Sequence, residues 1–155
     1  MKIRSICVFA LFLFFSVSGF AQTKPAWITS VEETVKKKET SWKIQKKIEY
    51  PQNDSYSYTL KSGTASASIE IAAYRVITNP EETFAGQVTV FDNTMGKNMK
   101  KTELANFGNE AYIWTGSKGA YTTIKFRKGN VFVDIFAPTE KTARRFAQYV
   151  FEQIP

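Results

Sequence analysis

Histidine is absent from the 155 residues, and the only cysteine is Cys7. Without imidazole the chain lacks the usual general base, the common Ser/His/Asp and Cys/His nucleophile systems and most transition-metal sites. It also lacks the Ser-x-x-Lys, Gly-x-Gly-x-x-Gly and phosphate-loop signatures. The sequence therefore predicts no catalytic residue, no cofactor-binding residue and no metal ligand, and the balance favours a protein that is not an enzyme.

One hydrolytic chemistry is still open, because two carboxylates at a fixed separation are enough for it. The candidate pairs are Glu110 with Asp134, and Asp92 with Glu103. Two acids within about 10 Å of each other in an open cleft would favour hydrolysis. A carboxylate-dependent hydrolase acting on an envelope substrate is therefore the alternative function.

The N-terminus carries the pattern of a secretory signal. Lys2 and Arg4 precede an apolar run over 6–17, and small Gly19 and Ala21 follow it. Such a charged, then apolar, then small-residue order is typical of a cleavable signal peptide, and the run is shorter than the roughly 20 residues that span a membrane. We predict a signal peptide at residues 1–21, cleavage after Ala21, and a protein that is either periplasmic in a bacterium or secreted.

The mature chain, residues 22–155, would be a single domain without cysteine, disulfide or transmembrane span. Loss of Lys2 and Arg4 lowers its formal charge from +7 to +5. A positive charge of this size serves solubility, or it attracts an anionic envelope component or a protein partner. The basic residues are spread along the chain, so we expect no nucleic-acid partner.

Hydrophobic spacing predicts an alternation of helices and strands. In chain order these are a helix ending at Lys38, strands at 42–50, 56–60 and 67–77, a helix capped by Asn79 and closing at Lys101, strands at 110–115, 120–128 and 131–137, and an amphipathic helix over 138–154. Within 42–50, the expected shared face consists of Trp42, Ile44, Lys46, Ile48 and Tyr50. The pattern predicts an α+β fold, a mostly antiparallel sheet of five to six strands with helices packed on it.

The last two strands carry a register prediction. Gly116-Ser117-Lys118-Gly119 predicts the preceding turn, and Gly129-Asn130 predicts a two-residue hairpin turn. Paired residue numbers then sum to 259, which sets Lys125 opposite Asp134 and the apolar positions opposite one another.

The segments Gly108-Asn109-Glu110-Ala111-Tyr112 and Lys125-Phe126-Arg127-Lys128-Gly129-Asn130-Val131, with the terminal helix, carry a resemblance over residues 108–152. This stretch resembles small uncharacterised exported bacterial domains, some of them similar to the PsbP-like α/β/α sandwich. The resemblance implies a fold and a compartment, and it brings no catalytic residue with it.

Two features support a binding function. Cations could form one basic face, with Tyr112, Trp114 and Tyr121 near it in the sheet; its predicted members are Lys43, Lys47, Lys125, Arg127 and Lys128. Such a face could stack sugars or bases, unless Tyr112 and Trp114 are core residues under a helix. A stripe of Phe91, Met95 and Met99 lines either an adaptable apolar pocket or an ordinary core. The favoured function is a non-enzymatic exported domain that binds a ligand or partner.

Overall fold

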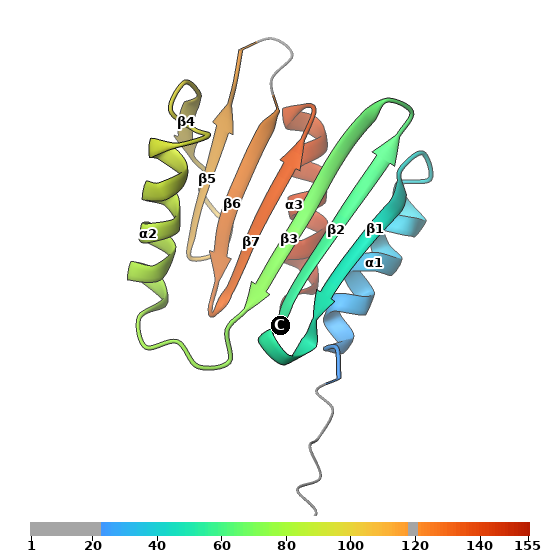
Figure 1. Ribbon diagram of the computed structural model, residues 1–155, viewed down its shortest axis with the longest axis horizontal. Coiled ribbons are helices and arrows are strands. Elements are labelled where there is room, and N and C mark those ends of the chain that lie inside the picture. The colour runs from blue at the N-terminus through green and yellow to red at the C-terminus, as the bar shows by residue number, and fades with distance from the viewer. Residues whose placement is uncertain (1–22, 118–120) are drawn as a thin grey trace, which may run out of the picture.

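The computed structural model describes residues 23–117 and 121–155; the predicted signal peptide and the predicted turn residues Lys118 and Gly119 lie outside them. Three helices and a seven-stranded antiparallel sheet make up the described part, with strand order β1-β2-β3-β7-β6-β5-β4 (Figure 1). The elements are α1 Ala26–Lys38, β1 Lys43–Tyr50, η1 Pro51–Asn53, β2 Ser55–Ser62, β3 Ala65–Ala73, α2 Pro80–Asn93, β4 Lys100–Glu103, β5 Glu110–Thr115, β6 Thr122–Lys128, β7 Val131–Ala137 and α3 Glu140–Gln153. The α+β class is confirmed, with one or two strands more than predicted.

The two faces of the sheet are covered unequally. Helices α1 and α3 pack together behind the sheet in Figure 1, over a large apolar core to which β2, β3, β5, β6 and β7 all contribute. Helix α2 covers only part of the opposite face, where Phe84, Val88 and Phe91 pack on Trp114 of β5 and Phe132 of β7. The remainder of that face, over β1, β2 and β3, carries no helix in the described part of the chain.

The register predicted for the last hairpin is confirmed. Ile124 pairs with Ile135, Phe126 with Val133, and Lys125 with Asp134. Gly129 has φ +58°, the left-handed conformation that a tight turn requires and that glycine adopts without strain. The local turn residues and the alternation of side chains were therefore enough to define this pairing.

The shared face predicted for the first strand is wrong. A β-bulge between Ile44 and Lys46 interrupts the alternation of β1. Trp42 and Ile44 consequently lie with the α1–α3 core, whereas Lys46, Ile48 and Tyr50 point to the other face. The extra residue of a bulge moves all following side chains to the opposite face, and a sequence pattern does not reveal it.

Helix α2 begins as predicted but ends earlier. The Asn79 side chain accepts a hydrogen bond from the Glu82 backbone N–H, which caps the helix start. The helix ends at Asn93, and the Phe91 carbonyl accepts the N–H groups of Thr94 and Gly96. A Cβ on Gly96 would lie 2.9 Å from the Phe91 ring, so glycine permits this tight turn.

The residues beyond that turn also leave the helix. Lys100 and Lys101, predicted as the helix end, instead begin strand β4 (Lys100–Glu103), which pairs with β5. The third strand is shorter than predicted too, because β3 ends at Ala73 rather than at residue 77. None of the described helices is long and apolar enough to cross a membrane.

Candidate functional site

An open groove of about 870 Å³ lies beside α2, where the helix leaves the sheet uncovered. Its floor belongs to β1, β2, β3, β6 and β7, and one wall is formed by Gly86 and Val90 of α2 and by Met95 in the turn after this helix. A smaller hollow of about 280 Å³ near Tyr121 shares Met95 and Phe136 with it. Concave sites of this size are where proteins bind small molecules.

A row of polar side chains crosses the floor of the groove. Strand pairing sets Ser57 opposite Glu70, Glu70 opposite Asp134, and Asp134 opposite Lys125. Residues directly opposite in neighbouring strands share one face, with Cβ atoms about 4.5–5.5 Å apart. Four strands thus bring a hydroxyl, two carboxyl groups and an ammonium group into one line.

Lys125 and Asp134 form an ion pair at the covered end of this row. The Lys125 side chain is only 7% exposed, and its Nζ lies 5.1 Å from the centroid of the Phe91 ring of α2. Burial raises the pKa of the Asp134 carboxyl, and the neighbouring Lys125 ammonium opposes that shift. The ammonium is therefore committed to one carboxylate and to the ring above it.

Glu70 is the exposed acid of the row, and it has no hydrogen bond or ion pair among the described residues. Desolvation raises its pKa, the Asp134 carboxylate raises it further, and Lys125 partly offsets both effects. The floor therefore offers two neighbouring carboxylates: Asp134, which is neutralised by Lys125, and Glu70, which has no ion-pair partner among the described residues.

The walls around this row are mainly apolar. Val90 is 64% exposed and Met95 is 66% exposed, while Phe91 and Phe136 lie deeper.

The stripe of Phe91, Met95 and Met99 was expected to line either an apolar pocket or an ordinary core, and each interpretation holds in part. Phe91 is core and also lines the groove, Met95 lines it from the turn after α2, and Met99 packs against the small core.

The five predicted basic-face residues do not share one surface. Lys43 is exposed on the groove side of β1, and Lys47 points to the α1 side, where it pairs with Glu32. Arg127 is buried and bound by Glu110 and Glu81. Lys125 is held by Asp134, and Lys128 reaches the Ile154 carbonyl and the Phe151 ring on the α3 side.

Three of the four predicted carboxylates are bound by neighbouring side chains, and the fourth, Glu103, is exposed on β4 opposite Tyr112. Glu110 on β5 is bound by Arg127, and β6 separates it from Asp134 on β7. Asp92 accepts hydrogen bonds from Lys101 and from the indole N–H of Trp114, at 2.7 Å each. Sequence reasoning missed Glu70, the carboxyl neighbour that Asp134 does have, because this contact depends on the β3–β7 pairing of strands distant in sequence.

The aromatic residues near the predicted face are divided in the same way. Trp114 is fully buried under α2, and Tyr112 stacks on Phe84 with ring centroids 6.4 Å apart. Trp114 is therefore a core residue, and Tyr112 is partly buried against the same core. Tyr121 is 50% exposed at the smaller hollow.

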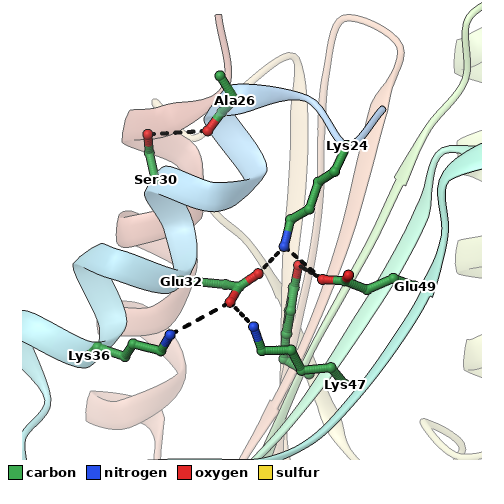
Figure 2. Close-up of polar contacts among 8 residues, drawn as sticks. Lys24, Ala26, Ser30, Glu32, Lys36, Lys47 and Glu49 are labelled. Carbon is green, nitrogen blue, oxygen red and sulfur yellow. Dashed lines mark hydrogen bonds and ion pairs between the residues drawn. The ribbon is translucent and has the colours of Figure 1, made fainter. Parts of the chain in front are cut away.

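A second polar cluster lies on the other side of the sheet, between α1 and β1 (Figure 2). Glu32 of α1 is 5% exposed and pairs with Lys24 and Lys47, while Lys36 Nζ lies 3.9 Å from it. Lys24 also bonds Glu49 at 2.6 Å. Burial alone would raise the pKa of Glu32, but the lysines outweigh burial and hold that pKa below its usual value.

This cluster is internally satisfied. The Tyr58 hydroxyl donates to Glu49 at 3.2 Å, and burial together with Glu32 and Glu49 raises the pKa of Tyr58. Its role is to attach the segment before α1 and the helix itself to the edge strand. The described residues contain no cluster of three or more His, Cys, Asp or Glu side chains that could hold a metal ion.

No protein-family model matches the chain, and neither a curated protein nor a solved structure matches it. The resemblance of residues 108–152 to exported PsbP-like domains stays a prediction.

Proposed function

We propose that this protein is an exported, non-enzymatic domain that binds a ligand in the groove beside α2, in the bacterial periplasm or outside the cell. The observation that carries the proposal is the groove of about 870 Å³, open to solvent, with apolar walls and a polar row on its floor. Binding sites for small molecules combine these features, because apolar walls supply affinity and a few polar groups fix orientation.

Export rests on the N-terminal pattern of positive charge, apolar run and small residues over 1–21. The proposal predicts a mature chain whose first residue is Gln22. Intact-mass measurement of the protein from the periplasm or culture medium of an expressing bacterium tests this. A chain that keeps residues 1–21 and stays in the cytoplasm would contradict export and leave the groove to be judged separately.

Gly86 provides a direct test of the groove. It lines the groove from α2, and a Cβ there would meet no atom within 4 Å, so Gly86→Trp puts an indole into open space. Ala85→Trp is the matched control, since Ala85 is exposed on the same helix and does not line the groove. Circular dichroism establishes that both variants are folded.

The measurement is mass spectrometry of small molecules released on denaturing protein purified from its own compartment. We expect one molecule to accompany the wild type and Ala85→Trp in stoichiometric amount and to be lost from Gly86→Trp. Equal amounts in all three proteins, or none above background in the wild type, would refute binding in the groove.

A carboxylate-dependent hydrolase is the second candidate, and one observation favours it. Glu70 and Asp134 are direct neighbours in an open groove, the arrangement such chemistry needs. The ion pair with Lys125 argues for binding instead, since it neutralises one member of the pair. A panel of chromogenic glycosides decides: turnover that both Glu70→Gln and Asp134→Asn abolish would replace the binding proposal.

A further inference from the structure

The groove carries a negative charge in a chain whose formal net charge is +7. Its charged lining residues are Glu70, Lys125 and Asp134. Lys125 and Asp134 compensate each other in their ion pair, so one formal negative charge remains, on Glu70. A cation approaching this groove therefore meets a local negative charge on Glu70.

Lys125 cannot form an ion pair with Glu70 without leaving its present partners. Its side chain is 7% exposed, bound to Asp134 and covered by the Phe91 ring. On its other side Glu70 faces Ser57 of β2, a neutral hydroxyl, and the α2 residues on the groove, Gly86, Gln87 and Val90, carry no charge. Glu70 is thus available to pair with a charged group of a ligand.

We propose that the groove takes an organic cation, a primary ammonium or guanidinium group on an apolar arm, with the cation against Glu70 and the arm along Val90, Phe91 and Met95. This assignment rests on the proposed binding function and names its ligand class. A charge-assisted hydrogen bond to a carboxylate is about twice as strong as a neutral one, and exposed Val90 and Met95 supply apolar contact. An anionic ligand is disfavoured because Lys125, the cation among the described lining residues, is already paired.

Binding should be linked to pH. The groups that face Glu70 are Asp134 and Lys125 across the sheet and the uncharged side chains of β2 and α2. Burial and Asp134 favour the protonated form of Glu70, and a bound cation favours the ionised form. Affinity for a cation therefore falls as acid protonates Glu70, and a Gln at this position removes the dependence.

The probes are 4-phenylbutylammonium, 4-phenylbutanol and 4-phenylbutanoate, which share one apolar arm and differ in charge. Affinity is measured by NMR titration of the mature chain, followed at the Val90 and Met95 methyl groups. We expect the ammonium to bind about tenfold more tightly than the alcohol, and Glu70→Gln to remove that advantage while leaving the alcohol unchanged. Glu33→Gln, the same change at an exposed site of α1 across the sheet, should behave as wild type.

The outcomes separate this inference from the proposed function. Equal affinity for the three probes at the groove methyls, or a preference for the carboxylate, overturns the cation assignment and leaves a binding groove in place. Absence of any shift at Val90 and Met95 with all three probes counts against both. An ammonium preference that survives in Glu70→Gln, or that does not weaken between pH 7 and pH 4, also rejects the assignment.

Discussion

Lys125 and Asp134 lie directly opposite each other in neighbouring strands, and their side chains form an ion pair beneath helix α2. The pair sits between the small core under α2 and the floor of the groove, with the Lys125 ammonium over the Phe91 ring. It therefore has two consequences: it stabilises the fold at this point, and it leaves Glu70 as the accessible charge.

Asp134→Asn should lower the free energy of unfolding by about 3–5 kcal/mol, because it leaves the buried Lys125 ammonium without a counter-charge. The double variant Lys125→Met with Asp134→Leu should regain most of this loss, since no charge is then buried. Urea denaturation of the three proteins checks both statements. A double variant no more stable than Asp134→Asn would contradict the ion-pair explanation.

Glu70→Gln should raise stability at pH 7, by about 0.5 kcal/mol, since solvent screens an exposed carboxylate. The folded protein holds the pKa of Glu70 above its usual value, so the protonated acid favours folding. That contribution is complete below the unfolded pKa and is lost as pH rises through the folded pKa. In thermal melts, the melting temperature of Glu70→Gln should therefore exceed that of the wild type at pH 7, and the two temperatures should converge near pH 3. A difference that grows in acid would contradict the raised pKa of Glu70.

Glu32→Gln should lower stability at neutral pH, by about 1–2 kcal/mol, because the buried carboxylate loses its ionic bonds to Lys24 and Lys47. The pKa of Glu32 is lowered in the folded state, so its contribution is present above the unfolded pKa and disappears as pH falls through the folded pKa. The destabilisation should accordingly shrink in acid. Glu33→Gln on the exposed side of α1 is the control and should change little.

Two glycine-to-alanine changes should have opposite signs. Gly86 lies inside α2 with open space where a Cβ would stand, so Gly86→Ala should add about 0.5–1 kcal/mol of stability. Gly108 has φ +77°, and a Cβ there would lie 2.3 Å from the Arg127 carbonyl oxygen, so Gly108→Ala should cost several times that amount. Guanidinium denaturation measures both, and a tolerated alanine at 108 would show that the loop before β5 can move away from β6.

Much of the local structure follows from short stretches of sequence. The Gly129-Asn130 turn and the flanking alternation define the β6–β7 register and with it the Lys125–Asp134 pair. The Asn79 cap predicts where α2 starts, and the apolar stripe of α3 predicts its buried face. These features depend on residues close in the chain, so turn geometry and hydrophobic periodicity are enough to predict them.

The tertiary structure alone decided the site. The bulge in β1 sends Ile48 and Tyr50 to the groove side, and the turn at Gly96 ends α2 and leaves Met95 exposed. The pairing of β3 with β7 puts Glu70 beside Asp134, although 64 positions separate them along the chain. Such pairing is set by how distant strands share one core, whereas the sequence pattern specifies only which way each side chain points along its own strand.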